Sequence, residues 1–457
     1  MRYATTLAFG CYLALSLGLS FAPQVHAQTI QQLFGFACDS KTNICADGKI
    51  PNSLLQSADG NFYGTTFAGG TGNNPSGTVF QITSAGQLTT LFTFVADQNG
   101  NFPDGLFPTS LIEGNDGFLY GTSGGGSGNS GVVFKLSKSG TIQVLYGLCN
   151  TCGDGSNPFG LKLGQDGNFY GFSSGRLFRV TPTGSFTVLH TFNSKTEGPT
   201  GLGLTQASDG NFYGTTLGGQ TIFTTLFRLT PAGQFTILHS FHYADFPTSG
   251  PIQASDQKLY GVRSGGIFDS SLSGSGFQEL TLSGLNLGTV IQGSDLNLWS
   301  LTPSNTAFPQ GAIRVISTAG SLLQTIPFNG TNGSLPVAPL VQSSDGKMVG
   351  VAEESGSVSQ GNTASGTVFT LDAGLTPPAP SVLNFSPSTG KVGSSVMIHG
   401  GHFIGCSQVS FNGVSASFQV LNTGTIMATV PTGATTGPIM VTNSGGTART
   451  TKNFRVQ

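Results

Sequence analysis

Seven aspartates recur along the chain, and because they are so numerous they are the first residues to consider for metal binding or catalysis. They are Asp59, Asp116, Asp166, Asp209, Asp256, Asp295 and Asp345. Repeated carboxylates could ligate Ca²⁺, and two of them about 5–10 Å apart could cleave a glycosidic bond. Because all seven occupy the same turn of a repeated unit, we expect them instead to fix that turn through side-chain to backbone hydrogen bonds. No metal and no cofactor is expected.

Polar residues that depart from the repeat are the remaining candidates for a ligand site. They are His242, Tyr243 and Asp245 after the fourth unit, Arg263 in the fifth, and Glu353 and Glu354 in a long loop of the seventh. The alternative is that they are solvated loop residues. Aromatic side chains at Phe102, Phe107 and Phe308 would suit stacking on a sugar ring, although core packing explains most phenylalanines equally well.

No recognised catalytic motif accompanies these residues. The chain has no nucleophile elbow and no HExxH sequence, and the glycine-rich stretch Gly124–Gly131 lacks the lysine of a phosphate-binding loop. His190 and His239 occupy the repeat position of Phe92, which makes them framework variants. No catalytic residue can therefore be assigned.

The cysteines indicate loop-closing disulfides. Cys38 and Cys45, like Cys149 and Cys152, follow a strand-like segment and precede an Asp-Gly pair. We expect each pair to be bonded, as exported proteins allow. A redox-active C-x-x-C or half of a zinc site is the alternative, but no second C-x-x-C or nearby histidine pair is present. Cys406 is left over, and His399 and His402 are interpreted as surface polar groups rather than zinc ligands.

The elements that position these residues come from an internal repeat. The segment Ser53–Thr66, with its Asp-Gly-Asn-Phe-Tyr-Gly-Thr-Thr, returns almost unchanged at Leu204–Thr216, and five weaker copies bring the total to seven, spaced by 39 to 57 residues. Each copy holds four short strands separated by Asp-Gly and Ala-Gly turns. Repeated four-stranded units of this period predict an all-β, seven-bladed β-propeller over residues 28–372.

The two ends of the repeat region predict how the ring closes. The seventh unit runs into a proline-rich segment without a fourth strand, whereas Thr29–Phe36 matches the fourth-strand pattern of Thr141–Leu148. The N-terminal strand is therefore expected to complete the last blade. Seven and a half blades or an open solenoid are the alternatives.

These motifs resemble a known family. Asp-Gly-Asn-Phe-Tyr-Gly-Thr-Thr and Gly-Thr-Val-Phe-x-Ile-Thr are similar to the GloVer-type tandem repeat of exported bacterial proteins, over roughly residues 28–372. The match is strongest in units one and four and faint in five and six, where Leu298-Trp299-Ser300 replaces Tyr-Gly-Thr. The resemblance implies an exported, repeat-built protein and no particular reaction.

A second domain is expected beyond a stiff linker at residues 373–380, Ala-Gly-Leu-Thr-Pro-Pro-Ala-Pro. Residues 381–457 hold short strands at regular spacing, typical of a β-sandwich. They resemble an IPT/TIG immunoglobulin-like domain over nearly their whole length. The resemblance implies a spacer or a binding module.

Composition narrows the class of protein. Only 8% of the residues are charged, against roughly 25% in an average protein, and the net charge of −2 offers no basic surface for nucleic acid. Residues 1–27 are interpreted as a secretory signal peptide, with Arg2, the apolar stretch Leu7–Ala22 and a cleavage site at Val25-His26-Ala27. An uncleaved anchor is the alternative. The exported chain is expected to be an extracellular, cell-surface or periplasmic monomer that is not inserted in the membrane.

Three functions follow from these observations. The first is a non-enzymatic propeller and TIG protein that binds an extracellular glycan, an envelope polymer or a surface protein. The second is a propeller enzyme, a lyase or a hydrolase, acting on polysaccharide, although few charged residues are available for it. The third is a purely structural surface protein without a ligand.

Overall fold

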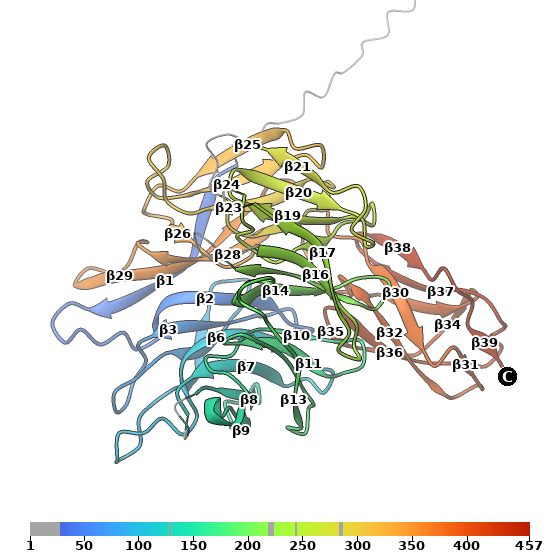
Figure 1. The fold of residues 1–457 in the computed structure, drawn as a ribbon, viewed down its shortest axis with the longest axis horizontal. Coiled ribbons are helices and arrows are strands. Elements are labelled where there is room, and N and C mark those ends of the chain that lie inside the picture. The colour runs from blue at the N-terminus through green and yellow to red at the C-terminus, as the bar shows by residue number, and fades with distance from the viewer. Residues whose placement is uncertain (1–27, 127, 129, 218–223, 243–244, 283–286) are drawn as a thin grey trace, which may run out of the picture.

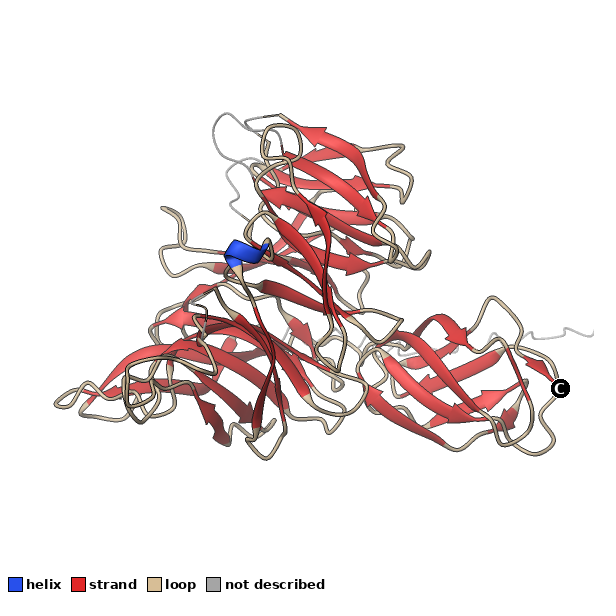
Figure 2. Cartoon of the chain, turned by 60° about the horizontal axis from the view of Figure 1, so that its bottom comes forward, coloured by secondary structure: helices blue, strands red, loops and turns tan. Residues whose placement is uncertain are grey.

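The computed structural model describes residues 28–457 except 127, 129, 218–223, 243–244 and 283–286. The predicted signal peptide and Tyr243 therefore lie outside the described residues. Within these residues the chain is built almost wholly of short antiparallel strands, as Figure 2 shows. The one helical segment described, η1 (Asn150–Cys152), has three residues, so no described helix has the length and apolarity to cross a bilayer.

Seven sheets follow one another along residues 30–371 of the described chain, with the strands of six of them in chain order (Figure 1). Sheet 1 comprises β2 (Lys49–Gln56), β3 (Phe62–Ala68), β4 (Thr78–Ile82) and β5 (Leu88–Thr93), and sheet 2 comprises β6 (Leu106–Glu113), β7 (Leu119–Gly124), β8 (Val132–Leu136) and β9 (Ile142–Gly147). Sheet 3 comprises β10 (Phe159–Leu163), β11 (Phe169–Ser173), β12 (Arg176–Val180) and β13 (Phe186–Thr191), and sheet 4 comprises β14 (Thr200–Gln206), β15 (Phe212–Leu217), β16 (Thr224–Leu229) and β17 (Phe235–Phe241). Sheet 5 comprises β18 (Ile252–Gln253), β19 (Leu259–Arg263), β20 (Gly266–Ser270) and β21 (Gln278–Thr281), and sheet 6 comprises β22 (Val290–Gln292), β23 (Leu298–Thr302), β24 (Ala312–Ile316) and β25 (Leu322–Pro327).

Sheet 7 is assembled from both ends of this region. It comprises β26 (Ser334–Pro336), β27 (Val341–Gln342), β28 (Met348–Glu354), β29 (Asn362–Leu371) and β1 (Ile30–Asp39). The innermost strand is split, because β26 and β27 both pair with β28. The outermost strand is β1, which pairs antiparallel with β29 from Ile30 opposite Leu371 to Asp39 opposite Asn362. The N-terminal strand thus completes the last sheet.

Hydrophobic clusters fill the spaces between neighbouring sheets. One cluster joins Phe36 of β1 and Val351 of sheet 7 to Phe62 and Phe80 of sheet 1. Six further clusters fill the other spaces, between sheets 1 and 2, 2 and 3, 3 and 4, 4 and 5, 5 and 6, and 6 and 7. The core is therefore divided among the junctions and does not form one central mass.

The repeated Phe-Tyr-Gly motif is explained by close packing between the second and third strands. A Cβ on Gly64 would lie 2.4 Å from the Phe80 ring and 2.4 Å from the Ser53 carbonyl oxygen. No side chain fits there, so the ring of the third strand packs directly over the glycine. The neighbouring Tyr63 is 1% exposed and fills the space toward the next sheet.

The C-terminal domain is a two-layer sandwich. One sheet contains β30 (Ser381–Ser386), β32 (Ser395–Gly401), β36 (Thr425–Thr429) and β35 (Phe418–Asn422), and the other contains β34 (Val414–Ser415), β33 (Gln408–Phe411), β37 (Ile439–Asn443) and β38 (Gly446–Arg449). Two short strands, β31 (Thr389–Gly390) and β39 (Arg455–Val456), pair in parallel. A single cluster that includes Val396, Phe403, Phe411 and Phe454 forms its core.

Candidate functional site

The repeated aspartates hold their turns by hydrogen bonds. Asp59 accepts one bond from the Asn61 backbone nitrogen at 3.0 Å and another from the Tyr63 hydroxyl at 2.8 Å. The corresponding tyrosine–aspartate bonds in the next four sheets are 2.7–2.8 Å long: Tyr120 to Asp116, Tyr170 to Asp166, Tyr213 to Asp209 and Tyr260 to Asp256. In sheet 6 the Trp299 indole nitrogen donates to Asp295, and in sheet 7 Asp345 accepts from Ser343 and from the Lys347 backbone.

These bonds occupy carboxylate lone pairs that a metal ion would need. Burial and the Asp59 carboxylate both raise the pKa of the Tyr63 hydroxyl, so this proton stays on the tyrosine at any physiological pH. Burial alone would raise the pKa of Asp59, but the hydrogen bonds from Lys138, Tyr63 and Asn61 outweigh it and lower that pKa. Among the described residues no three His, Cys, Asp or Glu side chains lie together as metal ligands would.

A belt of hydrogen bonds runs around the edge that carries these turns, which we name the turn face. At six junctions between neighbouring sheets, a side chain of one sheet accepts a hydrogen bond from the turn of the sheet before it. The acceptor is the last residue of the innermost strand, and the donor is the backbone nitrogen of the residue that precedes the repeated aspartate. The bonds run from Ala58 N to Glu113 Oε2 (3.0 Å), from Gln165 N to Gln206 Oε1 (2.8 Å), from Ser208 N to Gln253 Oε1 (2.8 Å), from Ser255 N to Gln292 Oε1 (2.8 Å), from Ser294 N to Gln342 Oε1 (2.9 Å) and from Ser344 N to Gln56 Oε1 (2.9 Å). The last of them links sheet 7 to sheet 1. We call this set the turn-face belt.

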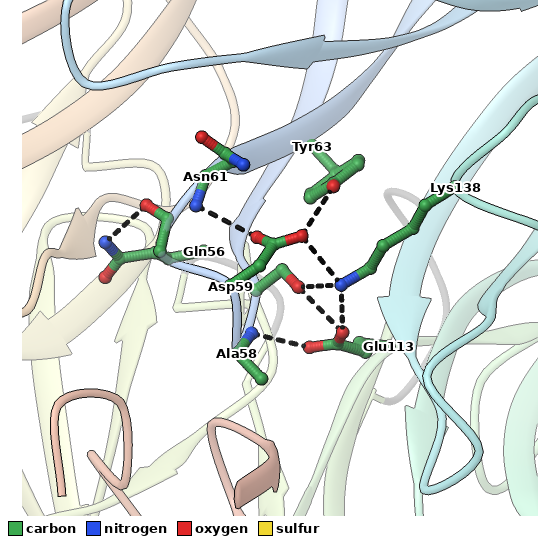
Figure 3. A network of polar contacts seen from close by, with 9 residues as sticks. Gln56, Ala58, Asp59, Asn61, Tyr63, Glu113 and Lys138 are labelled. Atoms are coloured by element: carbon green, nitrogen blue, oxygen red, sulfur yellow. Dashed lines mark hydrogen bonds and ion pairs between the residues drawn. The ribbon is translucent and has the colours of Figure 1, made fainter.

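The belt contains one acid, Glu113, which is buried and paired. The Lys138 ammonium lies 2.7 Å from Glu113 Oε1 and 3.0 Å from Asp59 Oδ2, and it also donates to the Ser57 hydroxyl (Figure 3). Burial would lower the pKa of Lys138, but its bonds to Glu113 and Asp59 raise it overall. This network of opposite charges joins sheets 1 and 2.

The opposite edge, which we name the loop face, carries the predicted ligand candidates in two separate places. Arg263 is 3% exposed and forms ion pairs with Asp245 at 2.5 Å and with Glu279 at 3.5 Å. The structure thus brings Asp245 and Arg263 together, but as an ion-paired group of sheet 5. His242 is exposed, and its side chain has no hydrogen bond to any described residue.

Glu353 and Glu354 lie in a hollow over the junction of sheets 7 and 1. Its volume is about 670 Å³, and Lys49, Ser355 and Thr363 also line it. Burial and the neighbouring Glu354 raise the pKa of the Glu353 carboxyl. A second hollow of about 390 Å³ lies beside the Cys38–Cys45 disulfide and shares Lys49. Lys49 was not predicted as a site residue, because only the meeting of sheets 7 and 1 sets it opposite the two glutamates.

One pair of stacked aromatic rings is exposed at the loop-face ends of β3 and β6. Phe67 and Phe107 stack with their centroids 4.6 Å apart and are 40% and 37% exposed. Phe67 directly precedes Ala68, which lines the smaller hollow. Phe102 and Phe308, the other two aromatics considered from the sequence, are half-buried, and the Arg314 guanidinium lies over the Phe308 ring.

Both cysteine pairs predicted from the sequence form disulfides, Cys38 with Cys45 and Cys149 with Cys152. Cys406 is free and half-buried, and burial raises the pKa of its thiol. His399 is 7% exposed and burial lowers its pKa, whereas His402, just beyond the end of β32, is exposed. His399 is therefore a buried group rather than the surface residue that was expected.

One innermost strand carries an unusual charge. Lys162 occupies the position that Leu55, Ile112, Thr205, Ile252, Ile291 and Val341 hold in the other sheets. Its side chain is exposed, yet burial lowers the pKa of its amino group, and no described residue pairs with it.

The repeated sheets and the terminal sandwich define an all-β protein with propeller-like blades and an immunoglobulin-like module. The chain belongs to the Gloeobacter/Verrucomicrobia repeat family, whose model matches residues 14–175 and 108–272. The model of the IPT/TIG domain matches residues 380–456. The resemblance to this repeat family and the resemblance to an IPT/TIG domain are thereby confirmed. A search of curated protein sequences finds no match.

Solved structures with a similar fold include two extracellular domains from B. thetaiotaomicron. One, assigned to a one-component system, has 12% identity and a TM-score of 0.51 over 81% of this chain and 46% of that protein. The other, assigned to a hybrid two-component system, has 10% identity and a TM-score of 0.50 over 92% of this chain and 57% of that protein. The chain spans about half the length of these proteins, and the likeness concerns the fold alone.

Proposed function

We propose that sheets 1 to 7 form a closed, seven-bladed β-propeller fastened by its N-terminal strand. Three independent contacts between the ends support closure. They are the pairing of β1 with β29, the hydrophobic cluster shared by Phe36, Phe80 and Val351, and the belt bond from Ser344 to Gln56. An open solenoid would leave the outer face of sheet 7 without this cluster, exposing apolar surface to water.

We further propose that the protein is exported and binds an extracellular polymer on its loop face. Two disulfides support export, because such bonds persist in oxidising compartments. The predicted signal peptide at residues 1–27 gives the route. The two similar solved structures are themselves described as extracellular domains.

The observation that carries the binding proposal is the hollow over sheets 7 and 1. It presents the carboxylates of Glu353 and Glu354 and the amino group of Lys49 beside hydroxyl groups and backbone. Charged groups form the stronger hydrogen bonds to polyhydroxylated ligands, and an exposed aromatic face stacks on a sugar ring. With the Phe67–Phe107 pair near the smaller hollow, these groups suit a glycan or an envelope polymer better than an apolar ligand.

One observation favours an enzyme as the second candidate. A carboxyl whose pKa is raised by burial and by a neighbouring carboxylate can hold a proton and act as a general acid, and Glu353 meets that description. Glu354, in the same hollow, would be the second acid of a polysaccharide hydrolase.

The test is a glycan and cell-wall polymer array with the exported protein, in which the supernatant is also assayed for new reducing and unsaturated ends. Binding without product is expected, with loss of binding in the Glu353→Gln/Glu354→Gln double variant and in Lys49→Met. Glu279→Gln and Lys452→Met, which change charges away from the hollow, are the matched controls. Product that disappears in the double variant would establish the enzyme. If neither binding nor product is found, the remaining function is that of a structural surface protein without a ligand.

A further inference from the structure

The turn-face belt has one gap among the described residues, at the junction of sheets 2 and 3. The residue at the end of β10 is Leu163, where the other six sheets carry glutamine or glutamate. Leucine has no acceptor for the Asn115 backbone nitrogen, so no belt bond connects these two sheets. This junction therefore leaves polar turn backbone without the cover that the side chain provides elsewhere.

The two turns that border the gap also differ from the others in sequence. The residue before the repeated aspartate is Asn115 in sheet 2 and Gln165 in sheet 3. At this position the other five sheets carry small residues: Ala58, Ser208, Ser255, Ser294 and Ser344. Two long carboxamides thus stand on either side of the only leucine in the belt positions, and together the three residues form what we name the amide seat.

The C-terminal domain is bonded to this seat. The Asn422 side-chain nitrogen at the end of β35 donates to Asn115 Oδ1 at 2.8 Å, and that of Asn384 in β30 donates to Gln165 Oε1 at 2.5 Å. One bond reaches each side of the gap. In Figure 1 β35 lies beside β10 and β11, and β30 is the opposite edge strand of the same sheet. His399 of the intervening strand β32 is buried and lies close enough to Asp166 for that carboxylate to act on its pKa.

The linker is held at both ends, which limits where the domain can move. Thr376 O accepts bonds from Ser294 Oγ at 2.8 Å and from Gln342 Nε2 at 3.3 Å, on the turns of sheets 6 and 7. At the other end, Pro378 O accepts a bond from Asn443 Nδ2 at 3.0 Å. A short linker fixed at both ends strongly reduces the entropy lost when the domain docks, so a few polar bonds suffice to hold it.

We propose that the amide seat (Asn115, Leu163 and Gln165) is a docking site for the chain's own C-terminal domain, and that Leu163 and the two carboxamides specify which junction it occupies. The domain then bridges the two sheets that the belt leaves unlinked, and the chain behaves as one rigid body. The turn face near the gap is covered, and the loop face remains open to a ligand. This inference does not depend on the proposed ligand.

The test replaces the seat with the residues that other sheets carry. The variant Asn115→Ser/Gln165→Ser keeps turns the repeat already tolerates, so the sheets should fold. Small-angle X-ray scattering and hydrogen exchange of the full chain are compared with those of the native protein. We expect a larger radius of gyration and exchange of the seat turns and of β30 and β35 that is about tenfold faster, since two neutral hydrogen bonds are lost.

Three comparisons keep the result decisive. Ser255→Ala changes the same turn position in sheet 5, far from the seat, and should leave both measurements unchanged. Asn384→Ala/Asn422→Ala removes the same two bonds from the other side and should reproduce the seat variant, with no further effect when the two are combined. Unaltered scattering and exchange in both double variants, with native fluorescence of Trp299, would overturn the proposal.

Discussion

Replacing Gln56 by Leu tests whether the ring of sheets is closed. Gln56 is 7% exposed; its Oε1 accepts the Ser344 backbone bond at 2.9 Å, and its Nε2 donates to Gly60 O at 3.1 Å. Each neutral bond contributes about 0.5–1.5 kcal/mol, and a buried donor left unpaired costs about 1–3 kcal/mol. Ser344 is half-buried and leucine restores some apolar packing, so the expected loss is about 2 kcal/mol.

The assay is urea unfolding of the chain with its disulfides intact, followed by the fluorescence of Trp299. This is the only tryptophan in the sequence, it is 2% exposed, and it packs in the cluster shared by sheets 6 and 7. Its emission therefore reports on the side of the molecule where closure takes place. The midpoint should fall while the slope with urea stays constant, because the surface exposed on unfolding is unchanged.

Gln253→Leu is the matched control, because Gln253 makes the same kind of bonds between sheets 4 and 5. Its Oε1 accepts the Ser208 backbone bond at 2.8 Å, and its Nε2 donates to Gln257 O at 3.3 Å. In a closed ring the two variants lose similar stability. If Gln253→Leu loses about 2 kcal/mol and Gln56→Leu less than about 0.5 kcal/mol, the Ser344 nitrogen is hydrated in solution and the ring is open.

Three further results are expected. Gly64→Ala should lose more than about 2 kcal/mol of folding stability, because its Cβ would lie 2.4 Å from the Phe80 ring and from the Ser53 carbonyl oxygen. In the control Gly124→Ala the nearest atom is 3.4 Å away, so the loss should be smaller. The urea midpoints of both variants test this. Lys162→Met should raise the melting temperature at neutral pH, where the protonated amine is destabilising. The gain should shrink as the pH rises through the lowered pKa of Lys162 toward 10.5. Calorimetry at several pH values measures this, and a gain that does not change with pH would contradict the prediction. Polymer binding at the loop-face hollow should strengthen as the pH rises through the raised pKa of Glu353, above its ordinary 4.5, and Glu353→Gln should remove that dependence in binding titrations.

Local features of the fold were predictable because they repeat. The contacts of the repeated motif lie within one sheet, as those of Asp59, Tyr63 and Gly64 show. Each copy of the motif therefore specifies its own turn and strands. The spare strand at the N-terminus was predictable for the same reason, since its pattern matches the fourth strand of other units. The structure adds that β1 runs on to Asp39 and that the innermost strand of sheet 7 is split into β26 and β27.

The candidate site was less predictable, because its residues come from distant parts of the chain. Glu353 and Glu354 were recognised as off-pattern acids, but Lys49 was not, since nothing in either segment indicates that they line one hollow. Asp245 and Arg263 were also recognised, but their ion pair satisfies them within sheet 5. Tyr243 lies outside the described residues and stays a prediction.

The sequence by itself determined the strands, the turns and the number of repeats, because these depend on alternation and on hydrogen bonds between residues close in the chain. Only the tertiary structure decided what the irregular positions do. In the sequence Leu163 is one more apolar residue, and only the belt bonds at the other junctions show that a hydrogen-bond acceptor is missing there. Asn384 and Asn422 likewise have a role only because the C-terminal domain contacts that junction. Contacts between segments more than 200 residues apart leave no periodic signal, so they appear only once the chain has folded.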